Sequence, residues 1–260
     1  VLDAENLTSG QKLKIAKELG YSETSFVSPS DVADLKLEYF TPTEEVPLCG
    51  HATIATFVLL NSLNMIHKSN YIIETNSGIL RIYIKEDGMI SMEQNIPTYF
   101  NILEPSLFIN CLTSEYIDNS LPIQIVSTGL KDILIPIHSI EELENLNVNH
   151  DMISNLCKEK EVVGIHTFTL TDKSDVTAIC RNFAPLYGIN EESATGTSNC
   201  ALACYLFKYY DKKKQYIFEQ GYNLGNISRL IVTITSHNDI IDSVLVGGYG
   251  YIVCKKQLYI

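Results

Sequence analysis

The chain has 260 residues, of which 45% are hydrophobic and 19% charged, and its formal net charge is −12 at pH 7. This length allows two domains with cores of their own, and the composition is typical of a folded globular protein. The negative charge argues against binding of nucleic acid or of an anionic membrane, because both require clustered Lys and Arg, and no apolar run reaches the about 18 residues that span a bilayer.

The first half of the chain has a helix, a strand, a Gly-bearing turn into a second helix, and a strand pair. In chain order these are Leu7 to Leu19, Tyr21 to Val27, Phe40-Thr41-Pro42 leading into Leu48-Cys49-Gly50-His51-Ala52-Thr53, Ala52 to Leu60, and Tyr71 to Ile84. The second helix is apolar all round, which predicts burial on every side.

The second half repeats this order when the chain is shifted so that Phe40 falls on Phe183. It opens with a hairpin, and the repeated elements follow it. In chain order these are Leu121 to Ile137, Ile140 to Lys158, Gly164 to Leu170, Phe183-Ala184-Pro185 leading into Ser193-Ala194-Thr195-Gly196-Thr197, Cys200 to Leu206, and Tyr216 to Ile234. The chain is therefore interpreted as two copies of one unit.

The fold class that follows is α+β, with two pseudo-symmetric domains over residues 1–112 and 113–248. Each is expected to be a curved, mostly antiparallel sheet wrapped around its central apolar helix, and a strand near 249–260 is expected to return to the first domain. The hairpin Leu121 to Ile137 has no counterpart in the first half. We therefore expect about 20 residues to precede Val1, given the usual size of such an element.

Three side chains of the first half are candidates for chemistry. Glu23 shares a face with Ser25 by strand alternation, although a Glu at a strand start more often faces solvent. His51 lies at the first turn of an apolar helix, where an imidazole suits proton transfer and a structural role is equally open. Cys49 is either a thiol activated by the helix start or a small thiol packed beneath the turn.

The corresponding turn of the second half runs from Glu191 to Thr197 and carries two carboxylates and three hydroxyls. Its structural interpretation makes Ser193 or Thr195 an N-cap, with acidic groups near the positive end of the helix. In the functional interpretation the two copies face one another, and Glu23, His51 and Glu192 converge on a cavity walled by two anion-binding helix starts.

The seven cysteines are scattered, odd in number and without a C-x-x-C pair. This pattern favours reduced thiols and a cytoplasmic location, and it argues against a zinc site. No metal is therefore expected.

These motifs resemble a known family when taken together. The quoted segments are Phe-x-Pro before Leu48 to Thr53, Arg181-x-Phe183-Ala184-Pro185 before Ala194-Thr195-Gly196, and Val246-Gly247-Gly248. They are similar to the phenazine-biosynthesis PhzF-like family, which has the diaminopimelate epimerase fold, and the likeness covers nearly the whole chain. The resemblance implies a cofactor-free site between two similar domains, in which Glu23 shuttles a proton between carbons of the substrate.

The same resemblance matches His51 and Glu192 to the family's His and Asp, but with two departures. Glu192 is longer than the family's Asp, and Ser193 replaces a Pro. Because misplacement by 1 Å can cost about 100-fold in rate, the substrate is not carried over. The fold's related racemases use two thiols, at the positions of Cys49 and near Ser193, so a symmetric two-Cys racemase is disfavoured here.

The leading hypothesis is a cofactor-independent isomerase of a small carboxylated metabolite. Glu23 is the base and then the acid, His51 and Glu192 orient the substrate or adjust its protonation, and the two helix starts hold its carboxylate. The residues assigned to that binding are Gly50, Ala52, Gly196 and Thr197. The alternatives are a Cys49-dependent epimerase or dehydratase, with Ser193 as a second candidate, and a non-catalytic binding protein. The sequence is also compatible with a homodimer.

Overall fold

The computed structural model describes residues 1–256 and divides into two compact units. The first unit comprises Val1–Glu93 and the chain from Gly247 onward, and the second comprises Gln94–Val246. The junction predicted between residues 112 and 113 thus falls inside the second unit. The physical reason is that β7 (Thr98–Ile102) already pairs with β8 (Gln124–Ser127), so the second sheet begins before the expected boundary.

The first unit is a sheet with one helix on each face. Its strands follow the order β1-β2-β4-β5-β6, with β3 paired to β2, and only the β2/β4 step is parallel. The elements are α1 (Ser9–Leu19), β1 (Thr24–Ser28), β2 (Leu35–Phe40), β3 (Glu45–Val46), α2 (Gly50–Ser62), β4 (Asn70–Thr75), β5 (Gly78–Ile84) and β6 (Ile90–Gln94).

Strand alternation assigns the two faces of β1. Phe26 packs in a core cluster with Ile15 and Ala16 of α1. The neighbouring Ser25 faces α2, where its Oγ lies 2.5 Å from the Thr56 Oγ1. Glu23, two residues before Ser25, therefore lies on the α2 side, as the alternation predicted.

The helix α2 is less buried than expected. Thr53, Phe57 and Leu60 face the sheet and are buried, whereas Ala55 is exposed. The prediction of burial on every side is wrong for this helix, because only one of its faces meets the sheet.

The second unit repeats this arrangement and extends it. Its strands follow the order β15-β14-β13-β11-β10-β9-β8-β7, with β12 paired to β11. The strands not yet located are β9 (Lys131–Pro136), β10 (Gly164–Leu170), β11 (Ala178–Ala184), β12 (Ile189–Glu192), β13 (Gln215–Gln220), β14 (Ser228–His237) and β15 (Ile240–Gly248). The helices are α3 (Ile140–Glu144), α4 (His150–Lys160) and α5 (Gly196–Tyr209), and short 3-10 turns include η4 (Pro185–Tyr187).

The strand order confirms the internal repeat. The series β10-β11-β13-β14-β15 copies β1-β2-β4-β5-β6, including the parallel step between β11 and β13 and the side strand β12 in place of β3. The predicted hairpin before β10 is β8 and β9, and β9 runs parallel to β10. The backbone of Val1 lies beside β1. Its amino group donates to the Ser25 carbonyl oxygen at 2.7 Å, and its carbonyl oxygen accepts from the Val27 nitrogen at 2.8 Å.

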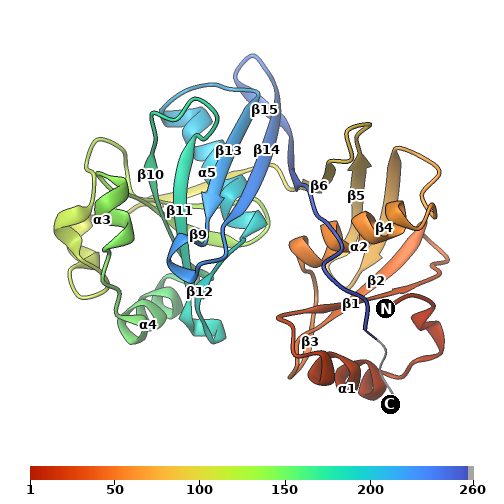
Figure 1. Cartoon of the computed structure of the whole chain (residues 1–260). Coiled ribbons are helices and arrows are strands. Elements are labelled where there is room, and N and C mark those ends of the chain that lie inside the picture. The colour runs from red at the N-terminus through yellow and green to blue at the C-terminus, as the bar shows by residue number, and fades with distance from the viewer. Residues whose placement is uncertain (257–260) are drawn as a thin grey trace. The chain divides into compact units, whose positions relative to one another are not determined.

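Both faces of the second sheet are covered, by α5 on one side and by α3 and α4 on the other (Figure 1). Residues Cys200 to Leu206 of α5 are buried without exception, which confirms the prediction for this helix. The helix expected over 140–158 is in fact two helices. The side chain of Asn149 accepts a hydrogen bond from the Met152 nitrogen and so caps a new helix after the end of α3.

The chain returns to the first unit at Gly247 through a close backbone approach. A Cβ on Gly247 would lie 2.4 Å from the Ile90 carbonyl oxygen, so only glycine fits. Residues 249–256 form no strand, contrary to the prediction, and 257–260 lie outside the described residues. Within residues 1–256, no helix combines the length and apolar character needed to cross a membrane.

Candidate active site

The first site is built where β1 and α2 begin. Glu23 directly precedes β1, and Cys49 is the N-cap of α2 with an extended backbone and no side-chain cap hydrogen bond. Thr53 anchors this turn, since its nitrogen and hydroxyl donate to the Cys49 oxygen at 3.1 and 2.7 Å. Gly50 and Ala52 lie in the first turn, where backbone N–H groups have no partner within the helix.

Three of the predicted side chains meet at this place. His51 Nε2 lies 2.9 Å from Glu23 Oε2, and Cys49 Sγ lies 3.6 Å from both ring nitrogens of His51. The Ser22 hydroxyl, which the sequence did not single out, lies 3.5 Å from His51 Nε2. The Glu23 side chain is 19% exposed and that of His51 is 42% exposed, whereas Cys49 is buried. The cluster is thus accessible from the His51 side.

The mutual contacts set the charge of each group. Burial alone would raise the pKa of Glu23, but contacts with His51, Ser22 and Cys49 outweigh it and hold that pKa below its ordinary value. The Cys49 sulfur and the Glu23 carboxylate raise the pKa of His51, whereas burial raises that of the Cys49 thiol. Near neutral pH the cluster therefore holds a carboxylate, an imidazolium and a neutral thiol.

This protonation pattern favours one of the interpretations given above for each residue. Glu23 does not face solvent but lies against His51, in the form that accepts a proton. Cys49 is the small thiol packed under the turn, in the form that is a poor nucleophile. The arrangement fits general base catalysis by a carboxylate beside a fixed positive charge.

In the second unit, the two adjacent carboxylates of β12 have different partners. Glu191 forms a bidentate ion pair with Arg181, with N–O distances of 2.9 and 2.8 Å, and both side chains are nearly buried. Arg181 also donates to the carbonyl oxygens of Leu143 and Leu146. Glu191 thus holds β12 in place, and it is Glu192 that remains beside the α5 start.

Glu192 belongs to a hydrogen-bonded turn. Its Oε2 accepts from the Thr195 hydroxyl at 2.7 Å, and its carbonyl oxygen accepts from Gln220 Nε2 at 2.6 Å. Gln220 is fully buried on β13 and also bonds Thr195 and Asn199. Thr195 occupies the N-cap position of α5, but its hydroxyl bonds Glu192 instead of capping the helix.

The other predicted residues of this turn lie close by. Ser193 is not a cap, and its hydroxyl accepts from Asn226 Nδ2 at 3.4 Å. Gly196 opens α5, and the Thr197 carbonyl oxygen accepts from the Thr128 hydroxyl at 3.2 Å. The second helix start therefore has a defined shape that is set by hydrogen bonds among hydroxyl, amide, carbonyl and carboxylate groups.

A buried polar chain beneath α5 was missed by the sequence reasoning. Ser198 donates to Asp132 Oδ2 at 2.8 Å and accepts from Asn182, which also lies 3.2 Å from His166 Nδ1. Burial raises the pKa of Asp132 to about 7, and it lowers that of His166 to about 3. The sequence analysis singled out none of these four residues, and Asp132 lies at the polar break of the predicted hairpin Leu121 to Ile137.

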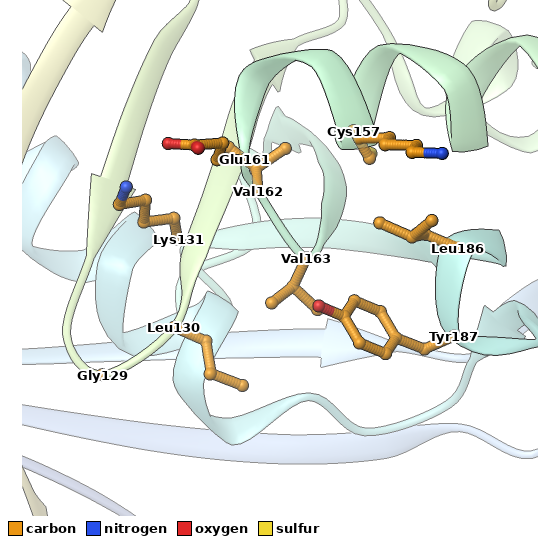
Figure 2. A pocket seen from close by; sticks show the side chains of 10 residues that line it. Gly129, Leu130, Lys131, Cys157, Glu161, Val162, Val163, Leu186 and Tyr187 are labelled. Atoms are coloured by element: carbon orange, nitrogen blue, oxygen red, sulfur yellow. The ribbon is translucent and has the colours of Figure 1, made fainter.

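The second unit also has a surface pocket, with a volume of about 410 Å³. Its walls come from the turn before β9, the end of α4 and the η4 turn, with Lys131, Glu161, Leu186 and Tyr187 among the lining side chains (Figure 2). None of the predicted site residues lines it.

The chain is similar to one known protein family and to isomerases of several bacteria. A family model described as phenazine biosynthesis-like protein, PhzC-PhzF, matches residues 1–256. An uncharacterized isomerase of Clostridium acetobutylicum is 33% identical over 99% of this chain and 91% of its own length. A trans-2,3-dihydro-3-hydroxyanthranilate isomerase of Pseudomonas chlororaphis is 28% identical over 95% of this chain and 88% of its own.

The fold is also found among solved structures. The crystal structure of the phenazine biosynthesis protein of the PhzF family from Bacillus anthracis superposes with a TM-score of 0.85 and 31% identity, over 95% of this chain and 88% of that one. The predicted fold class is thereby confirmed.

Proposed function

The chain belongs to the phenazine biosynthesis-like PhzC-PhzF family and is an isomerase of that family, and we propose that it moves a proton between two carbons of a small carboxylated metabolite. The observation that carries this proposal is the contact between the Glu23 carboxylate and the His51 imidazolium at 2.9 Å. No cofactor is required for such a transfer when the base is preorganised and the developing charge is stabilised.

The proposed reaction uses Glu23 twice. Its carboxylate takes a proton from one substrate carbon, and the electron pair of the broken C–H bond moves into the conjugated system of the substrate. The resulting carboxylic acid then returns a proton to a second carbon, so that the enzyme ends in its starting state. His51 keeps Glu23 ionised before the transfer and lies where its charge stabilises the anionic intermediate.

The start of α2 is proposed to bind the substrate carboxylate. The N–H groups of Gly50 and His51, at the very start of α2, have no partner within the helix, and the helix dipole favours an anion there. This explains how a chain with a net charge of −12 would bind an anion without a cluster of Lys or Arg. For Glu192 we propose a role in orienting the substrate or adjusting its protonation.

The first compound to test is trans-2,3-dihydro-3-hydroxyanthranilate, the substrate named for the Pseudomonas relative. Glu192 and Ser193, which depart from the motif expected for the family, are the reason to test other small carboxylic acids beside it. A thermal-shift screen of such acids identifies ligands before any assay of turnover is set up, since a ligand that binds the folded state raises Tm.

The decisive variant is Glu23→Gln, which keeps the shape of the side chain but removes the base. We expect turnover of the ligand found in the screen to fall by about 10²–10⁴-fold, with an unchanged circular dichroism spectrum. Turnover close to wild type in this variant would reject Glu23 as the base.

A second candidate is a Cys49-dependent epimerase or dehydratase, which the 3.6 Å contacts between Cys49 Sγ and the His51 ring favour. In that case alkylation of Cys49 would abolish turnover, and Cys49→Ser would be as inactive as Glu23→Gln. Retained turnover in Cys49→Ser selects the Glu23 mechanism.

A further inference from the structure

We propose that Glu23, Cys49 and His51 form a binding site for one divalent cation of the zinc type, and that a bound cation prevents Glu23 from moving a proton. The first half of this proposal concerns binding alone. The second half rests on the proposed function.

Two of the three separations between donor atoms are close to those that zinc requires. One ligand atom each from Glu23, Cys49 and His51 lies within 4.8 Å of the other two. Around a tetrahedral zinc ion, with Zn–S of about 2.3 Å and Zn–N of about 2.0 Å, the sulfur and nitrogen ligands are about 3.5 Å apart. The observed Cys49–His51 separation is 3.6 Å. The His51–Glu23 separation of 2.9 Å is shorter by a few tenths of an ångström than the about 3.3 Å expected for nitrogen and oxygen ligands.

The kinds of donor select the metal. A thiolate, an imidazole and a carboxylate are the three ligand types of protein zinc sites, whereas magnesium and calcium prefer oxygen ligands alone. Binding of the cation therefore releases the Cys49 thiol proton and the His51 imidazolium proton to water. Three protein ligands leave a fourth position of a tetrahedral ion open to water or to a substrate oxygen. The cysteine spacing argued against a zinc site and no metal was expected, because the ligands of this cluster come from two separate elements and not from a C-x-x-C pair.

One buried polar atom of the cluster lacks a well-aligned hydrogen-bond donor among the described residues. Glu23 Oε2 is buried and, within residues 1–256, nothing hydrogen-bonds to it in good geometry, although His51 Nε2 lies near it. A cation coordinated by both atoms would satisfy this oxygen and replace the poorly aligned contact. The positive end of α2 opposes a cation, but the two anionic ligands offset that effect.

Occupancy of the site has a direct consequence for chemistry. A carboxylate oxygen that coordinates a cation no longer has the same lone pair available for a substrate proton. Zinc would then act as an inhibitor or regulator of this active site, in competition with proton transfer.

The binding test uses Cd²⁺ and Zn²⁺ with the purified chain. Cd²⁺ titration followed by the thiolate-to-metal charge-transfer band is expected to saturate near one equivalent. The band should be lost in Cys49→Ser and kept in Cys254→Ser, which removes the one exposed thiol among the free cysteines of the described chain. Zn²⁺ affinity, measured by competition with a chromophoric chelator, should fall at least about 10-fold in His51→Ala and in Glu23→Gln. An unchanged band in Cys49→Ser, or a band lost in Cys254→Ser, would overturn the site.

Alkylation provides a second readout that does not depend on activity. Zn²⁺ is expected to protect Cys49 from iodoacetamide while Cys254 remains reactive, as measured by peptide mass spectrometry. Reaction of Cys49 at the same rate with and without Zn²⁺ would contradict the proposal.

The two halves of the proposal fail separately. If Cd²⁺ and Zn²⁺ bind as expected but Glu23→Gln retains turnover, the proposed function is wrong and the metal site stands. If Glu23→Gln is inactive but neither ion binds, the metal site is wrong and the function stands. If both ions bind and turnover with saturating Zn²⁺ equals turnover with a chelator, the claim that occupancy blocks proton transfer is overturned.

Discussion

The start of α2 and the start of α5 are copies of one element, but they differ in chemistry. At α2, a carboxylate, an imidazole and a thiol meet, and each alters the pKa of its neighbours. At α5, Glu192 joins hydroxyl and amide groups in a network centred on the buried Gln220. Duplication has thus kept the backbone turn in both copies while the titratable cluster occurs at α2 and a shape-defining network at α5.

If this contrast is correct, substitutions at the α5 start should lower the free energy of unfolding more than substitutions at the α2 start do. Substitutions at the α2 start should have the larger effect on turnover.

Removing the partner of a buried arginine should have the largest effect on stability. Glu191→Ala leaves Arg181 without its carboxylate, and we expect the free energy of unfolding in urea to fall by about 3–5 kcal/mol. Glu192→Gln, the matched control one residue along, keeps an oxygen for Thr195 and should cost about 1 kcal/mol or less. Equal losses in the two variants would remove the distinction between Glu191 and Glu192.

Loss of the Gln220 amide should cause the next largest fall in the free energy of unfolding among these side-chain replacements. Gln220→Leu leaves the Glu192 carbonyl and the Thr195 nitrogen without their partner, which should cost about 2–3 kcal/mol. Gln124→Leu is a suitable control, because Gln124 is equally buried but makes a single hydrogen bond, to the Phe100 oxygen. We expect the control to lose about 1 kcal/mol in the same urea titration.

Asp132 should make the stability of the second unit depend on pH. Burial raises its pKa from 3.8 to about 7, so the folded state binds a proton that the unfolded state has released. Stability from this group is therefore present at low pH and is lost as the pH rises from 3.8 toward 7.

In the wild type, the charge of Glu192 adds to burial in raising the pKa of Asp132. The variant Asp132→Asn has no carboxyl group at this position and therefore removes the dependence of stability on pH that Asp132 causes. Relative to wild type, we expect the variant to gain about 2 kcal/mol in its free energy of unfolding between about pH 4 and about pH 5.5. A difference that stays constant over this range would mean that Asp132 does not titrate in the folded protein.

The smallest effect is expected at the contact that positions α2 on β1. Ser25→Ala removes the hydrogen bond to Thr56 and should cost about 1 kcal/mol. Ser77→Ala, in the exposed turn between β4 and β5, is the control and should change stability by less than about 0.5 kcal/mol. A loss of stability well above about 1 kcal/mol in Ser25→Ala would show that the α2 start is as tightly constrained as the α5 start.

Local patterns were sufficient to predict most elements and the repeat, because each copy has the same order of apolar strands and Gly-bearing turns. His51 was selected by its position at a helix start, which is a local property, whereas Glu23 was selected through the family resemblance, because a Glu at a strand start more often faces solvent. Patterns failed where a contact between distant segments decides the outcome. The pairing of β7 with β8 shifted the domain boundary, and the Asn149 cap divided the predicted helix.

The buried groups of the second unit show the same limit. Arg181 and Glu191 lie ten residues apart, and neither residue type reveals from sequence that it will be buried with the other. The chain from Asp132 through Ser198 and Asn182 to His166 joins four separate elements, so no spacing along the sequence could indicate it.

We propose that Glu23, and not Cys49, moves the proton. The most direct test incubates the ligand found by thermal shift in D₂O with wild type, Glu23→Gln and Cys49→Ser, and follows deuterium at each carbon by NMR. The account predicts incorporation with wild type and with Cys49→Ser, and none above background with Glu23→Gln. Incorporation that persists in Glu23→Gln, or that disappears in Cys49→Ser, would contradict it.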